Sequence, residues 1–129
     1  VIQLAHQILD GYPPRLFHGS DRIFRDFINI EDVIQANIKA TNPKNSGIYN
    51  VGTGAARSFK DISDILQREL GVELGIEYIP NPYVGYQMHT QAEIRSTREN
   101  LEFSPSVSLE DGIKTYIPEI KCMHGMDLS

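Results

Sequence analysis

Apolar residues recur at helical spacing in several stretches of the chain, and prolines or glycines separate these stretches. The first stretch covers residues 1–9, where the apolar side chains fall on one face of a helix. No capping residue precedes it, although a helix normally begins with a side chain that accepts hydrogen bonds from its unpaired amides. We therefore interpret the chain as a fragment whose upstream part is missing.

Two later helices carry recognisable start signals. Ser58 and Ser108 are each followed three residues later by a carboxylate, which is the spacing of a capping box. Gly71 should end the first of these helices, and Pro118 should end the second. The buried stripe of the first helix is expected on Ile62, Ile65, Leu66 and Leu70.

The remaining helices have weaker signals. One should begin at Glu31 or Asp32 and stop near residues 42–43, before the loop over residues 44–47. Residues 97–103 form a short helix in this interpretation. The face of the longer helix that should be buried carries Val33, Ala36 and Ala40, with Ile34 and Ile38 beside them.

Four short segments are rich in β-branched and aromatic residues and are predicted to be strands: residues 15–17, 27–30, 48–51 and 77–79. Because helices alternate with short strands, the fold class is α/β. We expect one compact unit over residues 1–118 and a tail over residues 119–129. The strands over residues 27–30 and 48–51 are expected to belong to a larger sheet supplied by the missing part.

Composition narrows the classes of function. The chain has 129 residues and a net charge of −5, which argues against general binding to nucleic acid. No apolar run is long enough to cross a bilayer. The single cysteine, Cys122, excludes an intramolecular disulfide and fits a reducing cytoplasm. The four histidines lack metal-ligand spacing, so no metal site is predicted.

The segment over residues 16–27 has the residue types of a phosphate site. The Gly19-Ser20 turn can bring backbone amides and a hydroxyl close to a ligand, and Arg25 can grip two phosphate oxygens at once. Asp26 can orient Arg25 or accept from nearby backbone amides. The alternative is a surface hairpin that carries an ordinary salt bridge.

Two other segments were candidates for binding. In the loop over residues 81–90, Tyr86 can donate its phenol to a phosphate or sugar and Gln87 offers a bidentate amide, unless the tyrosines of the loop only cover the core. Residues 50–54 read Asn-Val-Gly-Thr-Gly and suggest a dinucleotide loop. However, Arg57 occupies the place of the third glycine, so a tight turn is the better interpretation.

Three segments together resemble the extended short-chain dehydrogenases/reductases. Residues 25–33 read Arg-Asp-Phe-Ile-Asn-Ile-Glu-Asp-Val, residues 48–54 read Ile-Tyr-Asn-Val-Gly-Thr-Gly, and residues 108–113 read Ser-Leu-Glu-Asp-Gly-Ile. They occur in the family's order and spacing. The resemblance implies a C-terminal portion of such an enzyme, with the last strands and helices of the Rossmann-type sheet and the small substrate-binding domain.

Two further segments narrow the resemblance. Residues 17–20 and residues 86–93 are similar to segments of the ADP-glyceromanno-heptose 6-epimerases within that family. The resemblance implies an ADP-sugar substrate, with Arg25 and Tyr86 near its pyrophosphate, and His18 stands where the family has glutamate. The residues implied in substrate binding are Phe17, His18, Gly19, Ser20, Arg25 and Tyr86.

The resemblance also implies what lies elsewhere. NADP or NAD would be bound mainly by the missing N-terminal domain, and no catalytic residue is predicted because no tyrosine has a lysine four positions downstream. The complete enzyme is expected to be a cytoplasmic homo-oligomer. Two alternatives stay open: another nucleotide-sugar epimerase or dehydratase, such as a UDP-hexose 4-epimerase, and an interaction module without chemistry.

Overall fold

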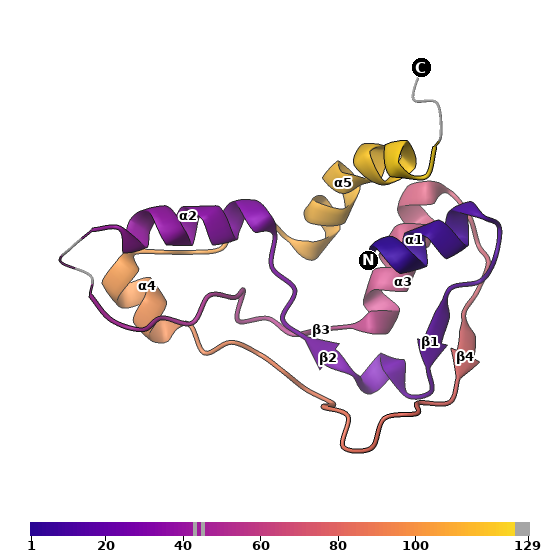
Figure 1. The fold of residues 1–129 in the computed structure, drawn as a ribbon, viewed down its shortest axis with the longest axis horizontal. Helices are drawn as coiled ribbons and strands as arrows, with labels where there is room; N and C mark the ends of the chain where they lie inside the picture. The colour runs from indigo at the N-terminus through magenta and orange to yellow at the C-terminus, as the bar shows by residue number, and fades with distance from the viewer. Residues whose placement is uncertain (43, 45, 126–129) are drawn as a thin grey trace.

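The computed structural model describes residues 1–42, 44 and 46–125. Expectations that fall on residues 43, 45 and 126–129 lie outside this range. Helices and short strands alternate, so the predicted α/β class is confirmed (Figure 1). The elements are α1 (Ile2–Leu9), β1 (Arg15–Phe17), the 3₁₀ turn η1 (Ser20–Arg22), β2 (Phe24–Arg25), α2 (Ile30–Ala40), β3 (Arg57–Ser58), α3 (Phe59–Leu70), β4 (Glu77–Ile79), α4 (Arg95–Leu101) and α5 (Leu109–Met123).

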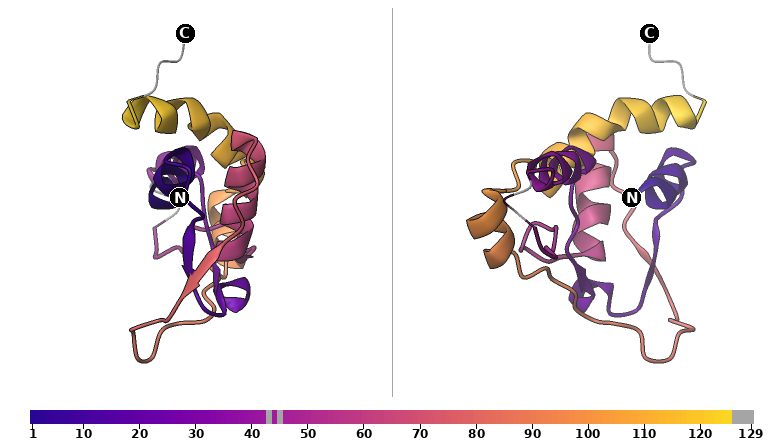
Figure 2. Two further views of the ribbon diagram at one scale, coloured as in Figure 1. Left: turned by 90° about the vertical axis from the view of Figure 1, so that its right-hand side faces the viewer. Right: turned by 60° about the vertical axis from the view of Figure 1, so that its left-hand side comes forward.

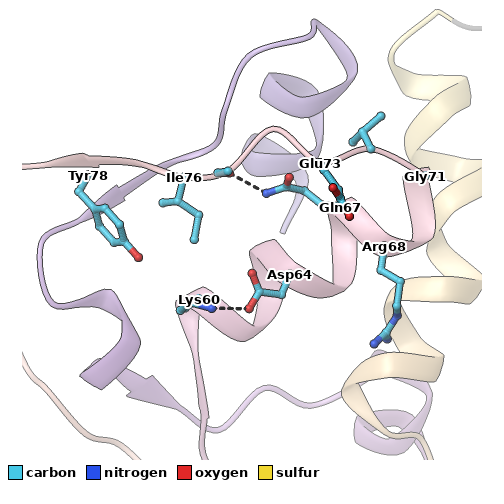
Figure 3. Close-up of a pocket in the computed structure, with 10 residues that line it drawn as sticks. Lys60, Asp64, Gln67, Arg68, Gly71, Glu73, Ile76 and Tyr78 are labelled. Carbon is cyan, nitrogen blue, oxygen red and sulfur yellow. Dashed lines mark hydrogen bonds and ion pairs between the residues drawn. The ribbon is translucent and has the colours of Figure 1, made fainter.

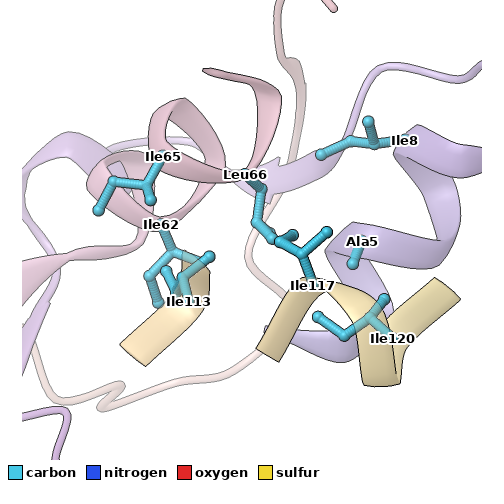
Figure 4. Packing of buried hydrophobic residues seen from close by; sticks show 8 residues of the cluster. All are labelled: Ala5, Ile8, Ile62, Ile65, Leu66, Ile113, Ile117 and Ile120. Atoms are coloured by element: carbon cyan, nitrogen blue, oxygen red, sulfur yellow. The ribbon is translucent and has the colours of Figure 1, made fainter. Parts of the chain in front are cut away.

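Three helices, α1, α3 and α5, pack together and bury the main apolar cluster (Figures 1 and 4). We call this part the helical core. Each helix contributes the side chains of one face. The expected stripe on α3 is confirmed at Ile62, Ile65 and Leu66, and Leu70 packs against the cluster while partly buried. The buried members are Ala5, Ile8, Ile62, Ile65, Leu66, Ile113, Ile117 and Ile120.

The start and end of α3 follow from local chemistry. The amide of Asp61 donates to Ser58 Oγ, and the amide of Ser58 donates to a carboxylate oxygen of Asp61, both over 3.0 Å. This is the predicted capping box, which satisfies two amides at once. Gly71 ends the helix in the left-handed conformation, with φ of 70°, where a glycine has no side chain to strain.

Two short strand pairs hold the segments that lead into and out of α3. β1 pairs with β4 in parallel, and Figure 2 shows the two segments side by side. β2 pairs with β3 in antiparallel fashion, with Phe24 opposite Ser58 and Arg25 opposite Arg57. The strands expected at residues 15–17 and 77–79 are therefore confirmed, whereas β2 and β3 were not predicted.

Two predicted strands are wrong. Residues 27–29 belong to no strand, and Ile30 is already the first residue of α2, where Asn29 Oδ1 caps the helix by accepting from the Glu31 amide. Residues 48–51 form no strand either. There the Asn50 carbonyl accepts from the Thr97 hydroxyl over 2.6 Å. High β-propensity needs a partner strand, and the described residues supply none at these two places.

The predicted end of the last helix at Pro118 is wrong. α5 continues through Pro118 to Met123, and Ile120 is fully buried. Packing on both sides of the proline outweighs the lost amide donor. The helix end is also tied to α1, because His124 Nδ1 lies 2.5 Å from His6 Nδ1 and His124 Nε2 lies 3.0 Å from Asp10. The boundary proposed at residue 118 would divide this helix.

A second part, which we call the α2–α4 arm, extends away from the helical core (Figure 1). Its own apolar cluster is small and consists of Ala36, Leu101 and Phe103, with Ile28 and Tyr49 against it. The predicted face of α2 is only partly correct. Ala36 is buried, but Ala40 is exposed and Ile38 is 56% exposed. The short helix expected over residues 97–103 exists as α4, two residues earlier.

Candidate functional site

A pocket of about 240 Å³ lies where α1, β1, the start of α3 and the loop before α4 meet. It collects residues that are far apart in the sequence, and most of them are apolar or aromatic. Three of the six residues implied in substrate binding line it. The lining consists of Val1, Gln3, Leu4, Arg15, Leu16, Phe17, Ser20, Ile23, Phe59 and Tyr86.

Aromatic rings form one side of this pocket. The rings of Phe17 and Tyr86 meet edge to face, with centroids 5.7 Å apart at 88°. Tyr83 stacks on Tyr86 with centroids 6.1 Å apart at 23°. Such contacts hold the rings in defined orientations. The irregular loop over residues 81–90 is thereby fixed against β1.

Ser20 reaches the pocket because of the turn before it. Gly19 adopts the left-handed conformation, with φ of 83°, and precedes the 3₁₀ turn that contains Ser20. Ser20 is only 1% exposed, and its hydroxyl oxygen has no hydrogen-bond partner within the described residues. A buried hydroxyl normally has a partner, so this one is suited to a ligand in the pocket.

Arg25 lies against the pocket through its neighbours. Its Nη1 donates to the Phe24 carbonyl over 2.8 Å, and its Cζ lies 5.2 Å from the centroid of the Tyr86 ring. On the other side, Cζ is 5.7 Å from the centroid of the Phe59 ring. The remaining N–H groups of the guanidinium make no further hydrogen bond to a described residue, so they are available to an anion.

Asp26 does not pair with Arg25. Its carboxylate accepts from the amides of Thr53, Gly54 and Ala92 over 2.9, 2.8 and 3.1 Å, and from the Thr53 hydroxyl. Of the two roles considered for Asp26, accepting from backbone amides is confirmed. Burial alone would raise the pKa of Asp26, but these four donors outweigh it and lower the pKa.

The glycine-rich turn after residue 50 faces this carboxylate. A Cβ on Gly52 would lie 2.5 Å from Ala92 Cβ and 2.7 Å from Asp26 Oδ2, which leaves room only for glycine. The turn therefore surrounds an internal carboxylate. This agrees with the interpretation of residues 50–54 as a tight turn and not as a dinucleotide loop.

The implied binding residues thus divide into three groups. Phe17, Ser20 and Tyr86 line the pocket, while Gly19 and Arg25 adjoin it. His18 does not line it; its ring stacks on Tyr78, with centroids 5.9 Å apart at 17°. The roles of all six residues in substrate binding stay predictions.

Sequence reasoning missed the role of Phe59 in the pocket and that of Asp32 in the α2–α4 arm. Phe59 lines the pocket beside Arg25, although its position directly after the cap Ser58 gave no sign of this. Asp32 is 2% exposed and accepts from the Ser106 amide and hydroxyl and from the Val107 amide. Burial raises the pKa of Asp32, and the three donors more than offset this, so the pKa is lowered.

A larger and more open hollow of about 780 Å³ lies between α3 and the segment that leads into β4 (Figure 3). None of the implied binding residues lines it. Three of its polar side chains already pair with described groups: Lys60 Nζ donates to Asp64 over 2.7 Å, and Gln67 Nε2 donates to the Gly75 carbonyl over 2.7 Å. We therefore take the smaller pocket beside Arg25 as the candidate site.

The described residues contain no group of three or more histidine, cysteine, aspartate and glutamate side chains that could hold a metal ion. Within the same range, no helix is long and apolar enough to span a membrane.

No family model matches the chain, but individual proteins do. It is 39% identical to the ADP-L-glycero-D-manno-heptose-6-epimerase of Brachyspira hyodysenteriae over 117 residues, which are 88% of this chain and 36% of that enzyme. The crystal structure of the Helicobacter pylori ADP-L-glycero-D-manno-heptose-6-epimerase matches with a TM-score of 0.82 at 44% identity, over 92% of this chain and 36% of that one.

The relatives are nucleotide-sugar epimerases. A further one is the UDP-glucuronic acid 4-epimerase of Bacillus cereus, whose structure contains UDP-glucuronic acid and NAD. It matches with a TM-score of 0.83 at 28% identity, over 93% of this chain and 38% of that one. The chain therefore spans little more than a third of the length of the epimerases that it matches.

Proposed function

We propose that this chain is the substrate-binding part of an ADP-glyceromanno-heptose 6-epimerase, which inverts C6″ of ADP-heptose. The observation that carries the proposal is the convergence of Phe17, Ser20 and Tyr86 on one pocket, with Arg25 against the Tyr86 ring. The similarity to two ADP-heptose epimerases, at 39% and 44% identity, supports the choice of substrate.

The chain's own groups suit the parts of an ADP-sugar. Arg25 offers N–H donors in a planar fork, which matches the oxygens of a pyrophosphate. The Ser20 hydroxyl has no partner in the described residues and can donate to or accept from a bound ligand. The aromatic side of the pocket, formed by Phe17 and Tyr86, can cover a flat apolar group.

The proposed enzyme would use NADP or NAD, which would supply the removal and return of a hydride at the substrate carbon. The residues described here do not fit a nicotinamide dinucleotide. Their one glycine-rich turn encloses Asp26, and the chain has no lysine four positions after any tyrosine. We infer that the remainder of the enzyme holds the cofactor and the catalytic pair, and that this chain alone is inactive.

Further properties belong to the same proposal. The complete enzyme would act in the cytoplasm, supply a precursor of the lipopolysaccharide core and form a homo-oligomer. Residues 48–51, which form no strand among the described residues, would lie against other parts of that enzyme. This would account for Ile48, which is 99% exposed.

Calorimetric titration with ADP and ADP-heptose tests the substrate role. We expect both to bind, and we expect Arg25→Met to weaken ADP binding by about tenfold or more, because charge-assisted hydrogen bonds are lost. Arg22→Met is the matched control, since Arg22 is exposed in the same segment and does not line the pocket. An absence of binding, even with the rest of the enzyme supplied, would refute the proposal.

Two comparisons separate the alternatives. Thermal shifts with ADP, UDP and dTDP sugars should show stabilisation by ADP sugars, since only a ligand that binds the folded state stabilises it. A larger shift with UDP sugars would favour the 4-epimerase alternative, which the Bacillus cereus structure motivates. Epimerisation of ADP-heptose by this chain alone would overturn the predicted inactivity.

A further inference from the structure

We propose that Phe59 is a positioning residue for Arg25: its ring and that of Tyr86 hold the guanidinium where it can meet the phosphate groups of the substrate. This inference rests on the proposed function, in which Arg25 grips a pyrophosphate. Its starting point is geometric. The guanidinium carbon lies 5.7 Å from the Phe59 ring centroid and 5.2 Å from that of Tyr86.

The strand pairing brings Phe59 to this place. β2 and β3 are antiparallel with Arg25 opposite Arg57 and Phe24 opposite Ser58, so Phe59 begins α3 opposite Ile23, diagonal to Arg25. The Phe59 amide also donates to the Ile23 carbonyl over 3.3 Å, which fixes the first residue of α3 against the segment before β2. Backbone geometry therefore sets the position of the Phe59 ring.

The ring is also fixed by packing. Phe59 meets Phe27 edge to face, with centroids 5.7 Å apart at 78°, and it packs against the helical core. Tyr86, on the other side, is held by Phe17 and Tyr83. An arginine side chain has several rotatable bonds, so two fixed ring faces restrict its freedom before any ligand arrives.

Arg57, opposite Arg25 in the strand pair, has carboxylate partners that Arg25 does not have among the described residues. Arg57 donates to Glu110 over 2.6 Å and to Asp61 over 3.3 Å, and the hydrogen bond to Glu110 is the main cause that raises its pKa. Arg57 is thereby neutralised by carboxylates of the helical core. Arg25 has aromatic rings and a carbonyl as its described neighbours, so its charge stays available to an anion.

Four substitutions in the full chain test this role. Phe59→Leu keeps an apolar side chain but removes the ring face, and Phe59→Trp restores an aromatic face. Phe103→Leu is the matched control, because it removes a buried ring in the α2–α4 arm that makes no described contact with Phe59 or Arg25. Arg25→Met reports whether the guanidinium grips a phosphate at all.

The first readout needs no ligand. The Nε–H resonance of Arg25 in ¹H–¹⁵N spectra should carry a ring-current shift that Phe59→Leu reduces and Phe103→Leu leaves in place. If Phe59→Leu does not move this resonance, or if Phe103→Leu moves it equally, Phe59 does not position Arg25.

The second readout is calorimetric titration with ADP and with adenosine. Phe59→Leu should weaken ADP binding by about threefold to tenfold and leave adenosine binding within about twofold, and Phe59→Trp should recover most of the loss. An equal loss for ADP and adenosine would refute the inference, because it indicates a change in the pocket wall alone. If Arg25→Met leaves ADP binding unchanged while the resonance shift behaves as expected, the phosphate grip fails and the positioning stands.

Discussion

The helical core and the α2–α4 arm are held together by different kinds of interaction. In the helical core, eight buried apolar residues from three helices form one cluster. The arm buries only three apolar residues of its own. Its connections are made instead by two carboxylates, Asp26 and Asp32, which accept from backbone amides of loops far away in the sequence.

This difference shows how irregular segments can be ordered. No regular secondary structure is present over residues 50–54, 91–92 and 106–107. Their backbone amides therefore have no hydrogen-bond partner from a helix or a sheet. Each carboxylate provides two oxygens that collect several of these amides. Both aspartates belong to the segment over residues 25–33 that carries the family resemblance. Through these hydrogen bonds the two aspartates fix the conformation of the loops.

The largest effect should come from truncating the apolar centre of the helical core. Leu66 is completely buried, so Leu66→Ala should lower the free energy of unfolding by about 3 kcal/mol. Ile48→Ala removes a similar side chain that is 99% exposed and should cost less than about 0.5 kcal/mol. Denaturant unfolding of the full chain measures both, and equal losses would contradict the described burial.

A smaller and more local effect is expected in the arm. Asp32→Asn replaces an oxygen that accepts from backbone with an amide donor, which should cost about 1–3 kcal/mol. Hydrogen exchange should become faster at Ser106 and Val107 and in α2, and change less in α3. Glu31→Gln, one residue away and exposed, is the control. Faster exchange throughout the chain would show that the two regions unfold as one unit.

Acid should weaken the two carboxylate contacts of the arm without any substitution. The pKa values of Asp26 and Asp32 are lowered in the folded chain, so their contribution to stability is complete above the ordinary aspartate pKa of about 3.9. It is lost as the pH falls through the lowered values. Exchange at Thr53, Gly54 and Ala92 should accelerate over that range, and Asp26→Asn should abolish this dependence. A pH-independent exchange rate in the wild-type chain, after correction for intrinsic chemistry, would contradict it.

The smallest effect is expected at the surface of the helical core. Lys60 and Asp64 lie 2.7 Å apart on α3, and their side chains are 42% and 52% exposed. Lys60→Met should change the free energy of unfolding by no more than about 0.5 kcal/mol, and less at high salt, because water and ions screen such pairs. If Lys60→Met lowered the free energy of unfolding nearly as much as Asp32→Asn does, the exposed ion pair would be as important as the buried carboxylate, which would contradict this prediction.

Prediction from sequence succeeded where the determinants are local. α3 was predicted with its capping box and its C-terminal glycine. Ser58 and Asp61 start the helix and Gly71 ends it through contacts within the adjacent turn, so the signal is local in the sequence. β1 and β4 were also found. Turn residues flank each of these two short runs of β-formers, and each strand has its pairing partner within the chain.

Prediction failed where the outcome depends on distant contacts. Residues 27–30 and 48–51 have strand-like composition, but the described chain gives them no ladder partner. Pro118 should end a helix by local rules, yet Ile117 and Ile120 are buried on either side of it. At the candidate site, Arg25 was identified by its chemistry. The aromatic rings beside it come from positions 34 and 61 residues later in the chain, a proximity that residue types and spacing do not reveal.

The close approach at Gly52 has a consequence for how related sequences diverge. A Cβ at this position would overlap Asp26 and Ala92, so the three positions share one small volume around a carboxylate. A larger residue at position 52 is acceptable only if positions 26 and 92 change with it. Positions 26, 52 and 92 are therefore expected to vary together across homologous chains. Gly52, which resembles a glycine of a nucleotide-binding loop, would then be retained because only glycine leaves room for the Asp26 carboxylate.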